Sequence, residues 1–309
     1  MKVLVKTAGL SRKEWLKWRT KGIGGSDVSV IAGINSHRSV YQLWKEKTGQ
    51  TEPEEEENDY THFGTVLEPI VKKEFTARTG LKVRAKKMIL QSSEYPFMLA
   101  DLDGVIKEDG KMCIFEAKTA SAYKQEIWEK GVPEAYILQV QHYMAVTGAE
   151  KAYVAALVGG NRFYRYEVLR DDALIEKIIA MEWDFWMNHV ENVQEPAPDG
   201  SPATGDYLNA LYGESNGNII ELPAEALTAF EQYDDISRRM DELKTEKEAV
   251  CNQFKNYLKE NETGMIGGRR VSWKQIQTTT FDKKRLEQEN PDIYEKYLSR
   301  NQYRRLLVA

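Results

Sequence analysis

The spacing of apolar residues along the chain changes between a helical and a strand-like period, and each stretch predicts one element. Apolar residues that recur every three or four positions predict helices, and apolar residues that alternate with polar ones predict strands. The helical period occurs at 11–21, 39–48, 61–80, 133–148, 171–193, 223–261 and 282–305. The strand period occurs at 81–90, 99–106, 111–118, 151–160, 162–169 and 268–277. This order predicts an α/β fold, in which helices flank a central mixed β-sheet on both sides.

A stretch rich in proline and glycine, residues 195–206, predicts a break between domains. We expect a core over residues 1–195, a linker over 196–222 and a helical extension with a small β element over 223–309. The long helix of the extension has apolar residues at nearly coiled-coil spacing, interrupted at Lys247. It could pack on its own domain or form an interface with another copy or a partner.

Composition narrows the class of protein. The chain has 309 residues, 41% hydrophobic and 29% charged, which is typical of a globular protein. No apolar run approaches a membrane span and no signal-peptide core is present, so we expect no membrane association and a cytoplasmic location. The two cysteines exclude a disulfide framework and a zinc site built on thiolates.

The net charge of −5 conceals a basic region. Residues 1–50 contain ten Lys and Arg against three Asp and Glu, and residues 81–90 contain four basic residues and no acid. Acid is concentrated in the C-terminal third and in residues 54–59, which we expect to be a solvated loop. A basic face on an acidic chain can still bind phosphates.

Two predicted strands, 99–106 and 111–118, are joined by Asp109-Gly110, the dipeptide most favoured in a two-residue hairpin turn. Counting outward from this turn puts Asp103 opposite Glu116 and Asp101 opposite Lys118, all on one face. A bulge at Gly104 would shift this pairing by one residue. Opposed carboxylates are unfavourable unless a cation lies between them, although a surface ladder of acids and lysines is the alternative.

A third carboxylate, Glu68, lies among apolar positions of the helix 61–80 and needs a metal, a lysine or a backbone group as partner. Hard oxygen ligands from Asp103, Glu116 and Glu68 suit Mg²⁺, or Mn²⁺ as a substitute, and the Ala117 carbonyl could complete the set. Lys118 is placed to orient or deprotonate a water and to balance charge on a phosphate. The chemistry indicated is hydrolysis of a phosphodiester.

A glycine-rich turn at 22–25 precedes Ser26 and Asp27, either of which could cap the next helix. Such a turn can present backbone N–H groups to an anion, or it can be a purely structural cap. The chain contains no nucleotide-triphosphate loop of the G-x-x-x-x-G-K-[ST] type.

Asp103 followed by Glu116-Ala117-Lys118 on the neighbouring strand resembles the PD-(D/E)-x-K nuclease signature, with Leu102 in place of the usual proline. The ordered set of motifs over residues 10–195 is similar to that of the YqaJ/phage lambda exonuclease-type viral recombinase family. The matching positions are Trp15, Arg19, Gly24, Ser26, Asp27, Val28, Gly64, Glu68, Asp103, Gly104, Glu116, Lys118, Ala135, Tyr136, Gln139, Val140 and Gln141.

This resemblance implies a restriction-endonuclease-like fold in which Asp103, Glu116 and Glu68 hold one or two Mg²⁺ ions and Lys118 handles the attacking water. It also implies that Gln139 contacts the metal-site water or the scissile phosphate. Arg19 and Ser26 are implied to bind a terminal 5′-phosphate. Asp101 stands where a phosphate-contacting hydroxyl is expected, so we leave it out of the phosphate site and do not expect strict dependence on a 5′-phosphate.

The activity implied by the resemblance is a Mg²⁺-dependent 5′→3′ exonuclease on double-stranded DNA ends in phage-type recombination. Such enzymes are often ring-shaped homo-oligomers and work with a single-strand annealing recombinase, which suggests a phage or prophage protein in a bacterial host. The alternatives are a structure-specific or nicking DNA endonuclease and a catalytically silent module that binds DNA ends.

Overall fold

The computed structural model describes residues 1–53 and 58–308, which form two compact units, Met1–Leu211 and Tyr212–Ala309. Most of the expected acidic loop, residues 54–57, lies outside the described residues. The division follows Leu211, inside the segment expected to be a linker, because residues 202–211 form a helix that packs on the first unit. In that helix Ala203 and Thr204 are buried, and the Tyr207 ring lies 6.1 Å from the Tyr41 ring.

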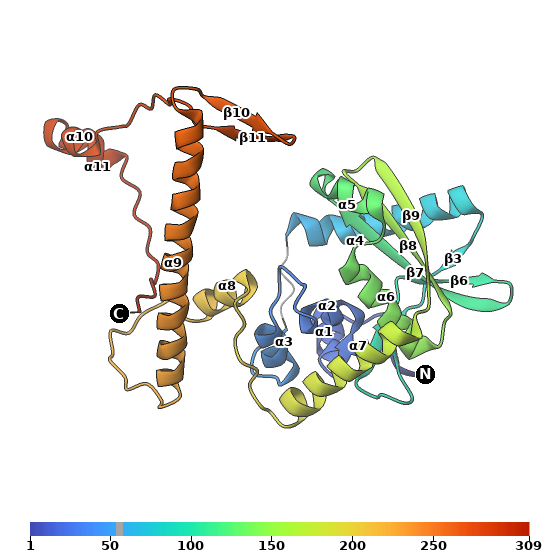
Figure 1. Cartoon of the computed structure of the whole chain (residues 1–309). Coiled ribbons are helices and arrows are strands. Elements are labelled where there is room, and N and C mark those ends of the chain that lie inside the picture. The colour runs from blue at the N-terminus through green and yellow to red at the C-terminus, as the bar shows by residue number, and fades with distance from the viewer. Residues whose placement is uncertain (54–57, 309) are drawn as a thin grey trace. The chain divides into compact units, whose positions relative to one another are not determined.

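The first unit is an α/β structure with two mixed sheets, and Figure 1 labels the strands of the five-stranded one. Its strands are β1 (Lys2–Lys6), β2 (Ile23–Gly24), β3 (Val83–Arg84), β4 (Met88–Gln91), β5 (Met98–Asp101), β6 (Gly104–Glu108), β7 (Lys111–Ala120), β8 (Lys151–Val158) and β9 (Arg162–Leu169). Its helices are α1 (Arg12–Arg19), α2 (Gly25–Ile31), α3 (Val40–Lys47), α4 (Asp59–Thr79), α5 (Gln125–Lys130), α6 (Glu134–Thr147), α7 (Asp172–Asp184) and α8 (Pro202–Leu211), with a 3₁₀ turn η1 (Ala122–Lys124) and a π-helical segment η2 (Phe185–Glu191).

The five-stranded sheet has the order β3-β6-β7-β8-β9, with β7 and β8 parallel and the other neighbours antiparallel. Because side chains alternate along β7, Phe115 packs with Phe75 of α4 in one apolar cluster, whereas Ile114 belongs to a second cluster with Val140 of α6. Burial of a side chain such as Phe75 contributes about 1.5–3 kcal/mol. The prediction of helices on both faces of a mixed sheet is confirmed.

The hairpin β6–β7 has the predicted register. Asp109 and Gly110 have φ of 46° and 83°, as the two central residues of a type I′ turn require. Glu108 pairs with Lys111 and the pairing runs without a bulge to Gly104 opposite Phe115. The next residue on each strand is Asp103 and Glu116, so the two carboxylates are neighbours.

Two predictions about neighbouring strands are wrong. Asp101 does not extend the hairpin opposite Lys118, because it ends β5 and pairs with Ile89 of β4 in the second sheet, of order β1-β4-β5-β2. Residues 81–90 are not one strand: β3 joins the five-stranded sheet and β4 joins the four-stranded one. The chain therefore changes sheets twice near the site, between β3 and β4 and again at Leu102–Asp103.

The second unit contains α9 (Ala226–Leu258), the hairpin β10 (Thr263–Ile266) and β11 (Arg269–Ser272), α10 (Lys283–Glu289) and α11 (Pro291–Lys296). Its long helix was predicted, and Leu258 at its end is buried against Gly264 of the hairpin. The expected strand 268–277 is the second strand of that hairpin. The expected helix 282–305 is two short helices, interrupted at Pro291, whose missing N–H suits the first turn of α11.

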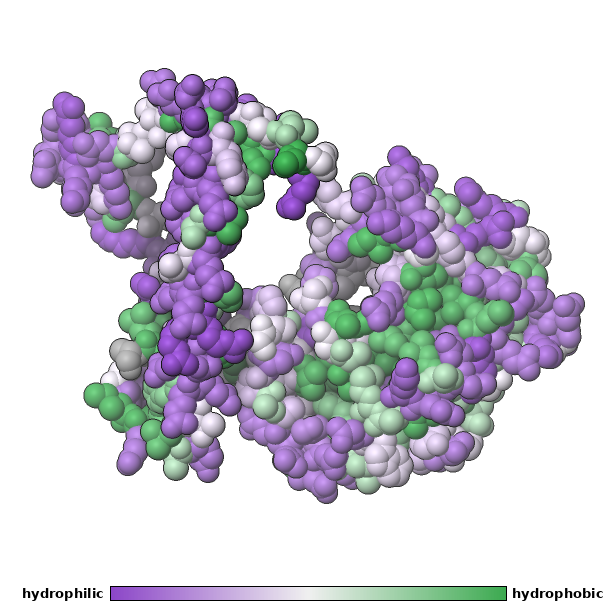
Figure 2. Space-filling view, in the orientation of Figure 1, coloured by the Kyte–Doolittle hydropathy of each residue, from purple (hydrophilic) through white to green (hydrophobic). Residues whose placement is uncertain are grey.

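Hydrophilic residues cover most of the visible face of α9, with apolar residues along its edge (Figure 2). Across the part of the chain that the structure describes, no helix has both the length and the apolar character needed to cross a bilayer.

Candidate active site

Most of the residues predicted from the sequence to form a site line one cavity of about 680 Å³ in the first unit. Its walls come from α1, α2, α4, β4, β5, β7 and α6. The predicted site residues in it are Arg19, Ser26, Glu68, Asp103, Glu116, Ala117, Lys118 and Gln139, and Asp101 and Tyr136 line it as well.

Asp103 and Glu116 form the deep end of this cavity. Asp103 Oδ2 accepts a hydrogen bond from the Ala117 backbone N–H at 2.8 Å, which fixes its carboxylate beside β7. Burial, and then the charge of Glu116, raise the pKa of Asp103 well above its usual range, and Lys118 opposes the shift. Burial also raises the pKa of Glu116, which is 2% exposed. The Asp103 shift thus reports both its burial and the nearby charge of Glu116, whereas the Glu116 shift reports mainly its own burial.

Lys118 and Gln139 complete a connected polar group around Glu116. Lys118 Nζ donates to Glu116 Oε1 at 2.7 Å and to Gln139 Oε1 at 3.0 Å, and Gln139 Nε2 donates to Glu116 Oε1 at 2.8 Å. Burial alone would lower the pKa of Lys118, but the charges of Glu116 and Asp103 raise it. The amine is therefore held in its charged form and aimed at the carboxylates, with the Tyr136 ring centroid 4.6 Å away.

Glu68 lines the same cavity, but its side chain forms an ion pair with Lys72, one turn further along α4. Among residues 1–53 and 58–308, no three His, Cys, Asp or Glu side chains converge closely enough to hold a metal ion together. The charge of Glu68 nevertheless contributes to the raised pKa values of both Asp103 and Glu116. From the sequence we expected Glu68 to have a metal, a lysine or a backbone group as its partner, and in this structure the partner is Lys72.

The donor set at Asp103 and Glu116 fits a hard divalent cation. Glu116 Oε2 is buried and has no hydrogen-bond partner among the described residues, which is costly for a carboxylate oxygen. When both carboxylates are ionised they carry two negative charges, and Lys118 supplies only one positive charge beside them. Carboxylate and carbonyl oxygens are the ligands that Mg²⁺ and Mn²⁺ prefer.

Arg19 and Ser26 are brought together at the other wall of the cavity. Arg19 Nη2 donates to Ser26 Oγ at 2.6 Å, and its guanidinium lies 4.7 Å from the centroid of the Trp15 ring. Trp15 Nε1 donates to Asp101 Oδ2 at 2.6 Å, and burial raises the pKa of Asp101. Asp101 is therefore held in place by the indole N–H of Trp15.

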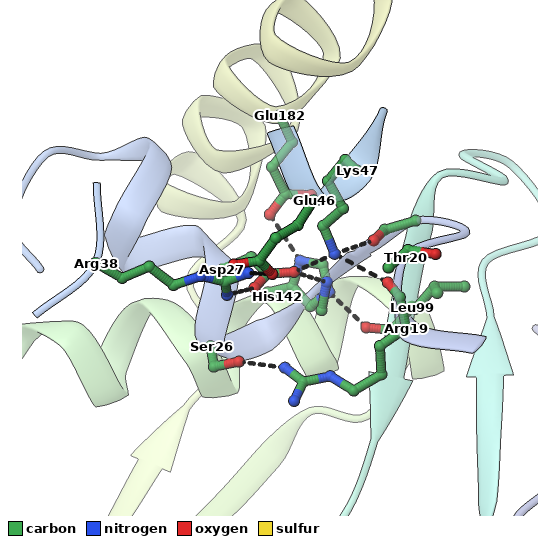
Figure 3. A network of polar contacts seen from close by, with 12 residues as sticks. Arg19, Thr20, Ser26, Asp27, Arg38, Glu46, Lys47, Leu99, His142 and Glu182 are labelled. Atoms are coloured by element: carbon green, nitrogen blue, oxygen red, sulfur yellow. Dashed lines mark hydrogen bonds and ion pairs between the residues drawn. The ribbon is translucent and has the colours of Figure 1, made fainter. Parts of the chain in front are cut away.

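A buried ionic network behind this wall fixes the start of α2 (Figure 3). Asp27, 1% exposed, accepts from Lys47 Nζ at 2.7 Å, from Arg38 Nη1 at 3.0 Å and from the Gly24 N–H at 3.0 Å. Burial would raise the pKa of Asp27, but the charges of Lys47 and Arg38 outweigh it and hold the pKa far below its usual range. Asp27 therefore caps α2 from within the helix, and Ser26 stays available to Arg19.

The same network reaches the backbone at Arg19 and at Gly22, which follows it. Lys47 Nζ also donates to the carbonyl oxygens of Arg19 at 2.9 Å and Gly22 at 2.6 Å. Figure 3 shows a second buried pair nearby, His142 Nδ1 with Glu182 Oε1 at 2.7 Å, and His142 Nε2 lies 2.8 Å from the Leu99 carbonyl oxygen. These contacts join α1, α2, α3, α6, α7 and β5 around the cavity.

Close packing of α2 on α6 brings the two walls together. A Cβ on Gly25 would lie 2.5 Å from the Tyr143 ring and 2.9 Å from Gln139 Cγ, so only glycine fits here. Tyr143 in turn accepts a hydrogen bond from Gln139 Nε2 at 3.1 Å. The position of Ser26 is therefore coupled, through the contact of Gly25 with α6, to the side chain of Gln139, which in turn contacts Lys118.

Sequence reasoning missed several basic and hydroxyl residues of the cavity. Lys86 and Lys87 come from the basic stretch 81–90, whose composition was the available signal. Lys72 stands four residues after Glu68, and this spacing predicts a helical ion pair. Tyr143 follows Gln139 by one helical turn and could have been found in the same way.

The chain is similar in sequence to a known protein family. Residues 14–150 match the model of the YqaJ-like viral recombinase domain. The chain is 44% identical over 307 residues to the uncharacterized protein YqaJ of Bacillus subtilis (strain 168), an alignment that covers 98% of this chain and 96% of that protein.

Two solved structures are also similar. An alkaline exonuclease (LHK-Exo) from Laribacter hongkongensis has a TM-score of 0.49 and 22% identity, over 58% of this chain and 95% of that one. A phage-related exonuclease from Haemophilus somnus 129PT has a TM-score of 0.44 and 17% identity, over 56% of this chain and 96% of that one.

Proposed function

The chain belongs to the YqaJ-like viral recombinase family, and from that premise we propose that it is a metal-dependent exonuclease acting on the ends of double-stranded DNA. The observation that supports this activity best is the cluster of Asp103, Glu116, Lys118 and Gln139 in one cavity. Buried carboxylates beside a charged lysine are the groups that a metal-assisted phosphodiester hydrolysis requires.

We propose that Asp103, Glu116 and the Ala117 carbonyl hold Mg²⁺, for which Mn²⁺ could substitute. When bound, the cation supplies Lewis-acid polarisation of the phosphate and lowers the pKa of water. Glu68 can join this set if its side chain leaves Lys72. The carboxylates then orient the reacting groups, and the cavity wall limits the access of bulk water.

Lys118 acts on the phosphate mainly as a fixed positive charge. Its raised pKa keeps the amine protonated, so it stabilises the negative charge that develops on the phosphoryl oxygens in the transition state. Gln139 holds the amine in place through its Oε1 atom and can turn its Nε2 donor toward the scissile phosphate. Lys118 is already held by two hydrogen bonds, so its charge needs little reorganisation when DNA binds, whereas Gln139 must release Glu116 or Tyr143 to donate to the phosphate.

Arg19 and Ser26 support a site for the terminal 5′-phosphate at the opposite wall. An arginine and a hydroxyl 2.6 Å apart form a donor pair suited to a phosphate, and Lys86 and Lys87 add positive charge. We propose on this basis that digestion begins at a 5′ end and proceeds 5′→3′. Asp101 also lines the cavity, so we propose a preference for 5′-phosphorylated ends and no absolute requirement.

The family resemblance supports a wider role in phage-type homologous recombination. We propose that the protein acts in the cytoplasm of a bacterial host, in a ring-shaped homo-oligomer around the duplex, and passes its single-stranded product to a single-strand annealing recombinase. Light scattering tests the ring: a monomeric mass together with intact processive digestion would remove it from the proposal.

Digestion of linear DNA and of closed circular DNA distinguishes the proposed exonuclease from a nicking or structure-specific endonuclease. An exonuclease degrades linear duplex in the presence of Mg²⁺ and leaves covalently closed circles intact, whereas an endonuclease converts the circles to nicked or linear forms. Binding of linear ends without any degradation, at all Mg²⁺ and Mn²⁺ concentrations, would instead identify a silent end-binding module.

A further inference from the structure

Helix α9 carries an apolar stripe that a single copy of the chain leaves exposed. Its 33 residues span about 50 Å and about five heptads. The a and d positions of one uninterrupted heptad register are, in chain order, Ala226, Ala229, Tyr233, Ile236, Met240, Leu243, Lys247, Val250, Phe254 and Tyr257. The larger apolar residues of this set are between 40% and 76% exposed. Lys247 therefore occupies an a position and does not shift the repeat.

The sizes of these residues favour one orientation of two such helices. In a parallel pair each residue meets its own copy, so Lys247 would meet Lys247 and the alanines would leave space between them. In an antiparallel pair with full overlap, each a residue meets a d residue. Ala226 then lies against Tyr257, Ala229 against Phe254, and Met240 against Leu243, so that small residues face large ones and the layers fill evenly.

The charges beside the stripe favour the same orientation. In the parallel pair Arg239, at a g position, would face Lys244 of the other copy, and these charges repel. In the antiparallel pair the g positions face each other, so that Arg239 lies beside Glu246 of the other copy, twice by symmetry. Sliding the helices by one heptad in either direction would instead oppose Arg239 to Arg239 or Glu246 to Glu246.

We propose that α9 is a dimerisation helix, which pairs in antiparallel orientation with α9 of a second copy in the register that joins Met240 to Leu243 and Arg239 to Glu246. Lys247 lies opposite Ile236 in this register, and its long aliphatic stem covers the apolar layer while its amine reaches solvent. The two-fold axis passes between Asp241 and Glu242. This proposal is independent of the activity of the first unit.

Charge reversal at Arg239 tests orientation and register together, because the two orientations predict opposite signs. In sedimentation equilibrium of the full chain, Arg239→Glu should weaken self-association about tenfold in the antiparallel dimer, since two attractive contacts become repulsive. The same change would tighten a parallel dimer through Lys244. The double variant Arg239→Glu/Glu246→Lys should restore the wild-type dissociation constant.

A matched control is Arg238→Glu, which makes the same charge change one residue away, on the side opposite the stripe, and should leave self-association unchanged. Leu243→Glu should abolish dimerisation, and Thr245→Glu, also opposite the stripe, should not. All five positions are solvent-exposed, so these variants are expected to fold.

Four outcomes would overturn the proposal: a monomeric wild-type chain at micromolar concentrations, an oligomer insensitive to Leu243→Glu, tighter association of Arg239→Glu, or failure of the double variant to recover. A ring formed by the first unit would keep its mass in every variant. Failure of nuclease activity would leave this proposal unchanged, because the assay measures mass alone.

Discussion

The buried ion pair between Asp27 and Lys47 gives a prediction that connects stability to the site. Asp27→Asn keeps the shape of the side chain and an oxygen that can accept from the Gly24 N–H, but it removes the negative charge. Lys47 is left buried, with 4% of its side chain exposed, facing a neutral amide and two carbonyl oxygens. Breaking a buried pair by removing one partner costs about 3–5 kcal/mol, and we expect a loss of about 3 kcal/mol because Asn retains part of the hydrogen bonding.

The pH dependence has a definite sign. Because its partners lower the pKa of Asp27 in the folded protein, the stabilisation is present above the unfolded pKa of about 3.9 and is lost as the pH falls through the folded value. The difference between wild type and Asp27→Asn should therefore be constant near neutral pH and shrink in acid. The double variant Asp27→Asn/Lys47→Met should cost less than the two single changes together, by about 1–3 kcal/mol, because it also removes the unpaired amine.

Urea unfolding followed by tryptophan fluorescence measures these differences, since Trp44 is buried on α3 beside the network. Asp171→Asn is the matched control: Asp171 is an exposed N-cap of α7, and Asn caps as well as Asp, so its stability should stay close to wild type. A loss below about 1 kcal/mol for Asp27→Asn at neutral pH would refute the reasoning, because such a value is typical of exposed ion pairs.

The remaining predictions concern the cavity itself. Gly25→Ala should lower the rate of DNA cleavage by a larger factor than it lowers the equilibrium constant for folding, because the new Cβ must displace Tyr143 and Gln139. An unchanged cleavage rate would mean that the cavity walls formed by α2 and α6 move independently. Asp103→Asn should raise the metal-free melting temperature near pH 8 and abolish stabilisation by Mg²⁺. The raised folded pKa of Asp103 means that its contribution to stability is lost as the pH rises through that value, and Asn has no such loss. Arg19→Ala should slow digestion of 5′-phosphorylated ends more than of 5′-hydroxyl ends, and equal losses on both would contradict the phosphate site.

The pairing of Asp103 with Glu116 could be predicted because a local signal sets it. Asp109-Gly110 fixes a two-residue turn, and the register of a hairpin follows from its turn. The family, confirmed by 44% identity to YqaJ over nearly the whole chain, was visible in the ordered motifs between Trp15 and Gln141.

What could not be predicted depends on contacts between distant segments. Asp101 leaves the hairpin because Leu99 to Asp101 pair with β4, and no residue near Leu102 marks that change of sheet. Glu68 was expected at the metal, and the structure instead shows its side chain in a salt bridge with Lys72 on the same helix.

The buried network was invisible for the same reason. In the sequence, Lys47 has the position expected of an ordinary surface lysine at the end of a helix. Its partner Asp27 is 20 residues away in the chain. His142 and Glu182 are 40 residues apart. These charges meet only because α3 and α7 pack around α2 and α6. The spacing of apolar residues along the chain does not reveal which helices pack together.

Digestion of an end-labelled linear duplex, with and without Mg²⁺, tests the central claim most directly when the wild type is compared with Lys118→Met and Asp103→Asn. We predict that the wild type releases label only with the divalent cation. Each variant should lose activity by at least about a hundredfold while it binds the duplex nearly as tightly as the wild type. Near wild-type digestion by either variant would contradict the assignment of Asp103, Glu116 and Lys118 as the residues that cleave DNA.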